Sequence, residues 1–227
     1  MYPLFVFGSL GLTAALAWAT YQSGRLLRAV PVRENLLLAP VENMVKGLLV
    51  FACIGLGALS GASPEQLGWT IRNGWRDLGL GLLLGLLTQL LANGLTLAAI
   101  KIWGKAIYSP VVMKNIMPRT RIQWISVPAA LGLAVILEEL LFRSRLIGGL
   151  SSTVPIPVLV VGFAAIFGLM HSPQGTFGVI MTGVLGMWLS VLFVWSGGLL
   201  LPLTAHYVIN FLQLLKAQAE QTWLDTY

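Results

Sequence analysis

Long apolar runs are the feature that most limits how this chain can fold. They lie roughly at 2–19, 45–62 and 78–100, from about 124 into the stretch 135–145, and then at 158–170, 176–195 and 199–215. A helix needs about 20 predominantly apolar residues to cross a bilayer, and shorter runs are accommodated by tilt or partial insertion. We therefore predict an all-α, polytopic transmembrane bundle of about seven to eight spans. We expect 1–227 to form a single membrane domain, with a motif-bearing catalytic half at 124–215.

Composition supports a membrane protein and argues against other classes. Only 10% of the residues are charged and 57% are hydrophobic, whereas a soluble domain carries about 25% charged residues. The apolar runs are continuous and do not alternate as the strands of a membrane barrel do. No basic tract interleaved with aromatic residues suggests a nucleic-acid partner. Cys53 is the only cysteine, so an intrachain disulfide is impossible and a buried packing role is expected.

Basic residues predict the orientation of the bundle. Five of them and no acid lie in the connection 101–121, namely Lys101, Lys105, Lys114, Arg119 and Arg121. Arg25, Arg28 and Arg33 lie in a second predicted loop, at 21–43. Because cytoplasmic loops are enriched in Lys and Arg, both loops are predicted to be cytoplasmic. The first helix is then uncleaved with its N-terminus outside, in what we expect to be the plasma membrane of a bacterium.

Two adjacent acids interrupt the fourth apolar run. Ionisable groups within a membrane span are costly and are usually functional, so Glu138 and Glu139 are candidates for a site. Arg143 lies four residues after Glu139, on the same helical face. Arg145 lies seven residues after Glu138, which also predicts a shared face. Adjacent helical positions point about 100° apart, so only one of the two glutamates is expected to face water.

The only two histidines of the chain fall in or at the end of apolar runs. Phe167 and His171 are four residues apart, as are His206 and Asn210. At this spacing both members of each pair lie on one helical face. Two histidines that accompany two membrane carboxylates indicate a shared site rather than separate packing positions.

These residue types suit hydrolysis by activated water. A carboxylate beside a neutral imidazole can remove a proton from water, and N–H donors of His206 and Asn210 can stabilise an oxyanion. A Gly-x-Ser-x-Gly elbow is absent, which disfavours an acyl-enzyme. No cofactor is expected. Zinc held by Glu138, His171 and His206 is the alternative, but the sequence has no His-Glu-x-x-His motif, and the nearby arginine would compete for the carboxylates.

The ordered motifs resemble those of a known family. Glu-Glu-x-x-x-Arg at 138–143, Phe-x-x-x-His at 167–171 and His-x-x-x-Asn at 206–210 look like the motifs of the CAAX protease and bacteriocin-processing family, also called the Abi family. The resemblance implies an intramembrane endopeptidase with a bundle of about eight helices. It also implies residue roles: Glu138 with His171 activates water, His206 and Asn210 form the oxyanion site, and Glu139 and Arg143 orient the site.

The family resemblance also bears on substrate and metal. The family includes the endopeptidase that removes the last three residues after a prenylated cysteine, and bacterial members linked to bacteriocin processing or immunity. The expected partners are therefore the lipid bilayer and a membrane protein or lipidated peptide as substrate. The family was first described as metal-dependent, but its glutamate-based mechanism needs no metal, and the residues here favour that mechanism.

Two other functions and one geometric conflict stay open at this point. The chain is alternatively a catalytically silent membrane scaffold or immunity protein, or a proton-coupled carrier in which Glu138, His171 and His206 relay protons. The predicted spans also place Glu138 at the outer end of the fourth helix and His171 at the inner end of the fifth. If the two residues meet, a boundary must shift or a segment must be re-entrant.

Overall fold

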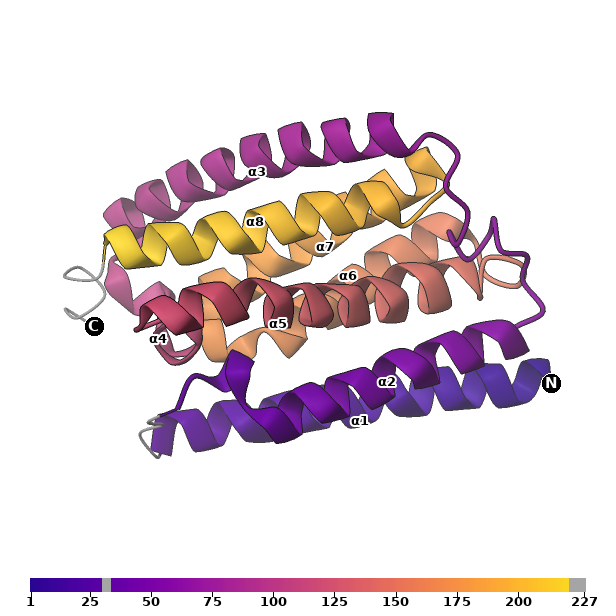
Figure 1. Cartoon of the computed structure of the whole chain (residues 1–227), viewed down its shortest axis with the longest axis horizontal. Helices are drawn as coiled ribbons and strands as arrows, with labels where there is room; N and C mark the ends of the chain where they lie inside the picture. Colours follow the sequence, from indigo (N-terminus) through magenta and orange to yellow (C-terminus); the bar gives the residue numbers. More distant parts are fainter. Residues whose placement is uncertain (30–33, 221–227) are drawn as a thin grey trace.

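The computed structural model describes residues 1–29 and 34–220, and in these residues the chain forms a helical bundle without strands. In Figure 1 the axes of the long helices are roughly aligned, with α1 and α2 side by side at one edge and α3 at the other. Seven long helices match the seven predicted spans, which confirms the all-α prediction. They are α1 (Tyr2–Ala29), α2 (Pro40–Leu59), α3 (Gly74–Trp103), α5 (Arg121–Glu139), α6 (Ile156–Met170), α7 (Gly175–Ser196) and α8 (Leu200–Ala219).

Five stretches of the described chain are long and apolar enough to cross a membrane. They are Tyr2–Leu27, Pro40–Leu59, Gly74–Trp103, Arg121–Gly148 and Ser172–Ser196, while α6 is a shorter apolar helix. Apolar side chains such as Phe7, Phe51 and Leu91 are largely exposed along these helices. An exposed apolar surface of this kind is what contact with lipid requires.

The prediction that residues 21–43 form a loop is wrong for most of them. Helix α1 continues to Ala29, and Leu36–Leu38 forms a 3-10 turn (η1) before α2 starts at Pro40. The apolar run ends near residue 19, but no proline follows until Pro31, and a residue that precedes a proline is disfavoured in a helix. Residues 30–33, which include Arg33, lie outside the described residues.

The connection from α3 to α5 also contains structure that was not predicted. A 3-10 turn (η2, Lys105–Ile107) and the short helix α4 (Val111–Ile116) lie within the basic connection 101–121. Asn35, which caps η1, donates from Nδ2 to the carbonyl oxygens of Ile116 and Met117, at 2.8 and 3.1 Å. The connection is thus tied to the segment between α1 and α2.

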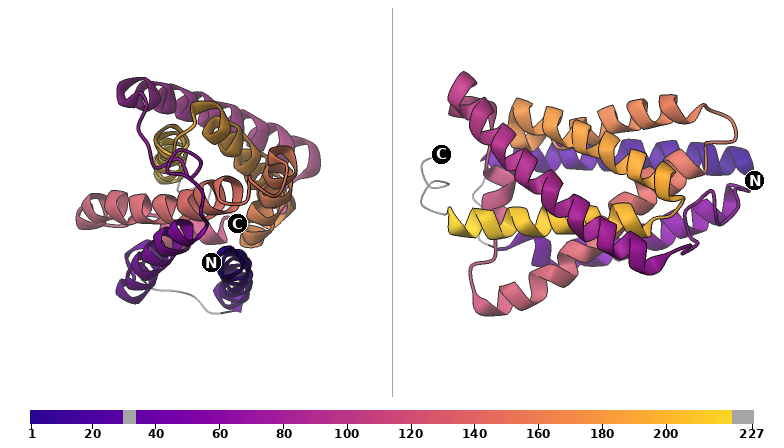
Figure 2. Two further views of the ribbon diagram at one scale, coloured as in Figure 1. Left: turned by 90° about the vertical axis from the view of Figure 1, so that its right-hand side faces the viewer. Right: turned by 90° about the horizontal axis from the view of Figure 1, so that it is seen from above.

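Small residues allow α3 to approach α8 closely. A Cβ atom at Gly81 would lie 2.6 Å from the Thr204 Cβ, and one at Gly85 would lie 2.8 Å from the Val208 Cβ. Both contacts advance along the two helices in the same direction, so the chain runs the same way in α3 and α8, as Figure 1 shows, and Figure 2 shows that the two helix axes cross. The Gly-x-x-x-Gly pair therefore serves the helix packing that its spacing predicts.

Helix α5 does not end at the two glutamates. It passes without a break into a π-helical segment of nine residues (η3, Leu140–Gly148), in which every residue is buried. Glu138 and Glu139 therefore lie inside a longer helix, Arg121–Gly148, and the expectation that they lie at its far end is wrong. The extra turns remove the conflict with the position of His171, because the glutamates lie well before the end of this helix. π-Helical segments are rare and occur frequently at functional sites.

The π-helical segment directs its two arginines apart. Arg143 contacts Glu139 and α7, whereas Arg145 donates to the Cys53 Sγ of α2 at 3.4 Å and to the Ser9 carbonyl of α1 at 3.3 Å. Arg145 therefore does not pair with Glu138 as its spacing predicted, because a π-helical turn changes the rotation per residue on which that prediction relied. Cys53 is buried, with 1% of its surface exposed, which confirms its expected placement.

Candidate functional site

A chain of three side chains links α5, η3 and α8 inside the bundle. The Arg143 Nη1 donates to the Glu139 Oε1 at 3.0 Å, and the same oxygen accepts from the His206 Nδ1 at 2.7 Å. The Arg143 Nη2 donates to the Gly186 carbonyl of α7, also at 3.0 Å. Glu139, Arg143 and His206 are all buried, so a carboxylate, a guanidinium and an imidazole meet inside the bundle.

This arrangement places a proton on the Nδ1 of His206. An ionised carboxylate only accepts hydrogen bonds, so the Nδ1 of His206 carries the proton directed at Glu139. The Nε2 then faces the other glutamate, with the Glu138 Oε2 at 3.6 Å. Glu138 is 33% exposed at its side chain and Glu139 is 0% exposed. Only Glu138 is therefore accessible to a substrate.

His171 is oriented by its own helix. Its Nδ1 lies 2.7 Å from the Phe167 carbonyl oxygen, and because a carbonyl oxygen only accepts, this Nδ1 carries the proton. The Nε2 of neutral His171 therefore has a free lone pair. The Phe167 ring lies 4.7 Å from the His171 ring, and the Arg143 guanidinium lies 5.0 Å from the Phe167 ring on a cation–π contact. Phe167 thus connects His171 to the buried arginine.

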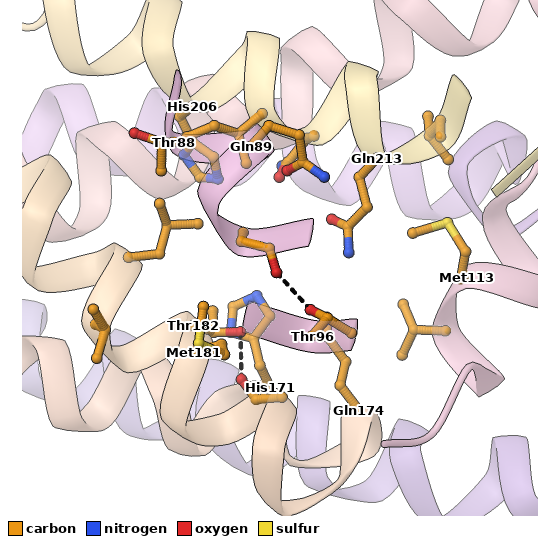
Figure 3. A pocket seen from close by; sticks show the side chains of 18 of the residues that line it. Thr88, Gln89, Thr96, Met113, His171, Gln174, Met181, Thr182, His206 and Gln213 are labelled. Atoms are coloured by element: carbon orange, nitrogen blue, oxygen red, sulfur yellow. Dashed lines mark hydrogen bonds between the residues drawn. The ribbon is translucent and has the colours of Figure 1, made fainter. Parts of the chain in front are cut away.

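A cavity of about 730 Å³ brings the predicted residues together, and its lining includes Glu138, His171, His206 and Asn210. In Figure 3 the imidazoles of His206 and His171 lie on opposite sides of this cavity. The volume is in the range of sites that bind small molecules or peptide segments. Of the supporting residues, Phe167 also lines the cavity, and Glu139 and Arg143 lie buried behind it. Among the described residues, Glu138 and His171 do not form a direct hydrogen bond with each other.

The comparison with known families bears on this part of the chain. The family model described as type II CAAX prenyl endopeptidase Rce1-like matches residues 120–212. This segment is therefore similar to the CAAX protease family. The match runs from the start of α5 into α8 and includes every motif residue from Glu138 to Asn210. No curated protein and no solved structure matches the chain.

The match to the CAAX protease family supports a general class of activity. The matched family is one of prenyl endopeptidases, and the chain carries the apolar helices of an integral membrane protein. An endopeptidase of the membrane, acting on a membrane-associated substrate, is thus the function that the family supports. The family match does not extend to α1, α2 and α3.

The structure contains functional contacts that the sequence did not indicate. Spacing pairs Glu139 with Arg143 but gives no sign that His206, 67 residues further along, binds the same carboxylate oxygen. Gln89 and Asn93 of α3 and Gln213 of α8 also line the cavity. Their isolated position in apolar runs was the one available signal, because polar groups inside a span seldom occur without a role.

The side-chain arrangement bears on the alternative of zinc at two points. Within residues 1–29 and 34–220, no group of three or more His, Cys, Asp and Glu side chains is placed to hold a metal ion. The Nδ1 atoms of both histidines are directed at protein oxygens, so only their Nε2 atoms could bind a metal. The mechanism below is written with the residues of this chain alone, and the role of a metal stays a prediction.

Proposed function

We propose that the protein is an intramembrane endopeptidase that hydrolyses a peptide bond of a membrane-associated or lipidated substrate with activated water. One observation carries the proposal: Glu138, His171, His206 and Asn210 line a single cavity inside a bundle of apolar helices. Four polar groups that converge in this way are costly in a membrane domain unless they act together. The family of the segment 120–212 agrees with this activity.

Glu138 and His171 are proposed to activate the attacking water. The Glu138 carboxylate is the more exposed of the two glutamates, and the His171 Nε2 has a free lone pair because Nδ1 is bound to the Phe167 carbonyl. Water bound between them gives a proton to Glu138 as its oxygen attacks the carbonyl carbon. The same proton is then transferred to the leaving nitrogen when the C–N bond breaks. The products are a carboxylic acid and an amine, and no covalent enzyme intermediate forms.

His206 and Asn210 are proposed to stabilise the oxyanion. The His206 Nδ1 is committed to Glu139, so this residue donates to an oxyanion from Nε2, in its doubly protonated form. An imidazolium balances the charges of the cluster, because two carboxylates then face one guanidinium and one imidazolium. The Asn210 Nδ2 is the second donor. Donors that are oriented in advance in a dry site stabilise developing charge at little reorganisation cost.

Glu139 and Arg143 are proposed to be positioning residues. The Glu139 Oε1 holds the His206 ring, and Arg143 holds Glu139 while its second amino group is anchored on α7. A carboxylate that orients an imidazole is familiar from hydrolases of other folds. Neither side chain needs to touch the substrate.

The activity is tested with purified protein in nanodiscs and a peptide that carries a prenylated cysteine near its C-terminus. Mass spectrometry should detect two fragments whose masses sum to the peptide plus one water. The bilayer, the plasma membrane of a bacterium and a lipidated peptide substrate are part of this proposal. If the peptide stays intact with this substrate and with an unmodified transmembrane peptide, a scaffold or a carrier becomes the better account.

A further inference from the structure

Three carboxamide side chains extend the polar surface of the cavity beyond the four site residues. They are Gln89 and Asn93 of α3 and Gln213 of α8, and all three line the cavity that holds Glu138 and His206. Gln89 is only 5% exposed and lies in a stretch with a mean hydropathy of 1.7. Figure 3 shows Gln89 and Gln213 around the same opening as His206. Buried amides in an apolar helix require partners.

The amides of Gln89 and Asn93 bond to each other along α3. The Gln89 Nε2 donates to the Asn93 Oδ1 at 2.9 Å, so this bond runs along α3 and does not join α3 to α8. Close contact between these helices is provided instead by Gly81 and Gly85. The bond leaves the Gln89 Oε1 as an acceptor and the Asn93 Nδ2 as a donor. One acceptor and one donor are what a peptide main chain complements.

The spacing of the amides matches an extended peptide. Residues four apart on a helix are separated by about 6 Å along its axis, and residues two apart in an extended chain by about 6.6 Å. Gln89 and Asn93 therefore repeat at the interval of successive main-chain groups that face one side of a strand. Gln213 lies seven residues after His206 on α8, about 10 Å along the axis, which is the length of about three extended residues.

We propose that Gln89, Asn93 and Gln213 form a strip that binds the main chain of the substrate, in extended conformation, on one side of the scissile bond. The inference rests on the proposed function and deepens it. The strip begins beside the Glu138–His206 pair and follows α3 and α8 in their common direction, towards the basic connection 101–121. It contains no charge, so it recognises amide groups and is indifferent to substrate side chains. The strip therefore selects substrates that present an unfolded, extended segment.

Binding in an inactive background tests this strip apart from the chemistry. The protein carries Glu138→Gln and is placed in nanodiscs, and the probe is a fluorescent peptide with a prenylated cysteine. A series of probes replaces one amide at a time by an ester, which removes an N–H donor and keeps the side chains. Fluorescence anisotropy gives Kd for each probe with the parent, Gln89→Leu and Gln213→Leu. Gln218→Leu is the matched control, because Gln218 is exposed on α8 and does not line the cavity.

The expected result is a coupled loss. Gln89→Leu should weaken binding of the all-amide probe about tenfold, the effect of one neutral hydrogen bond. One ester probe should bind the parent about tenfold more weakly than the all-amide probe does. The same ester probe should bind Gln89→Leu no more weakly than it binds the parent. Gln213→Leu should weaken binding and Gln218→Leu should leave it unchanged. Unfolding temperatures check that all variants are folded, and Gln213→Leu, whose residue is only partly buried, serves if Gln89→Leu does not fold.

Three results would overturn the strip. The first is that no probe binds the parent. The second is that Gln89→Leu and Gln213→Leu both bind the all-amide probe as tightly as the parent does. The third is that every ester probe loses as much affinity in the variants as in the parent. If the coupled loss is found but the wild-type protein does not cleave the all-amide probe, the strip stands and the proposed hydrolysis fails. The two claims thus fail separately.

Discussion

The Nδ1 of His206 lies 2.7 Å from the Oε1 of Glu139, the same oxygen that Arg143 binds at 3.0 Å. This contact joins two motifs that lie 67 residues apart. It divides the labour between adjacent glutamates, because Glu139 is occupied by protein partners and Glu138 is left to the cavity. The buried ion pair therefore contacts a residue of the candidate site, in agreement with the proposed positioning role of Glu139 and Arg143.

Breaking this pair from either side should destabilise the protein. Glu139→Gln leaves the buried Arg143 without its carboxylate, and loss of one partner of a buried pair costs about 3–5 kcal/mol. Arg143→Met likewise leaves the buried Glu139 carboxylate without its guanidinium partner. The double variant should lose clearly less than the sum of the two single losses, since no unpaired charge remains. Chemical unfolding in detergent micelles measures all three, and strictly additive losses would show that the two groups do not interact.

Substitution at the α3–α8 contact should disturb both stability and activity. In Gly85→Val the new side chain meets the Ala205 carbonyl and Val208, each 2.8 Å from the position of the Cβ. Overpacking of this kind costs about 1–3 kcal/mol, and it also displaces the α3 wall of the cavity. Gly94→Val is the matched control on the same helix, because a Cβ there meets nothing within 4 Å. Equal unfolding temperatures for both variants would contradict the packing.

The orientation of the bundle is tested with epitope tags. We expect a tag within the connection 101–121 to be reached by antibody only from the cytoplasmic side, since its five basic residues favour that side. A tag in the connection 60–73, after α2, should be reached only from outside. Inverted and right-side-out vesicles distinguish the two. The opposite pattern of protection would reverse the proposed placement of the N-terminus.

Chelation addresses the role of a metal. Because Glu138 and His171 suffice for the proposed water activation, cleavage in the presence of a strong chelator should proceed at an unchanged rate. Dialysis against the chelator before reconstitution provides the more stringent version. An activity that is lost under these conditions and is restored by added zinc would show that the metal-free mechanism is wrong.

The sequence predicts the helices well but not their continuation or their pairing. Apolar length identifies seven helices, because lipid imposes that length directly. Hydropathy does not reveal that α1 continues through polar residues to Ala29. Polar residues end the apolar run but do not end the helix, and the next proline is Pro31. Hydropathy also does not reveal the π-helical turns that separate Arg143 from Arg145, because it reports the length of an apolar run and not the hydrogen-bond pattern of the helix within it.

The candidate site was predictable in its members and less so in its contacts. Motif order identified Glu138, His171, His206 and Asn210, which line one cavity. The pairing of His206 with Glu139 depends on how α8 packs against α5, and this is a tertiary property that spacing within one helix does not contain. Gln89 has the same limitation, because its position facing the cavity depends on the close approach of α3 to α8.

The most direct test of the account is the rate of peptide cleavage by Glu138→Gln in nanodiscs. This change keeps the shape of the side chain and removes its ability to accept a proton, so the rate should fall about 10²- to 10⁴-fold with an unchanged unfolding temperature. Glu65→Gln, in the exposed connection before α3, is the matched control and should cleave at the wild-type rate. Cleavage by folded Glu138→Gln at the wild-type rate would contradict the central claim that Glu138 activates the water.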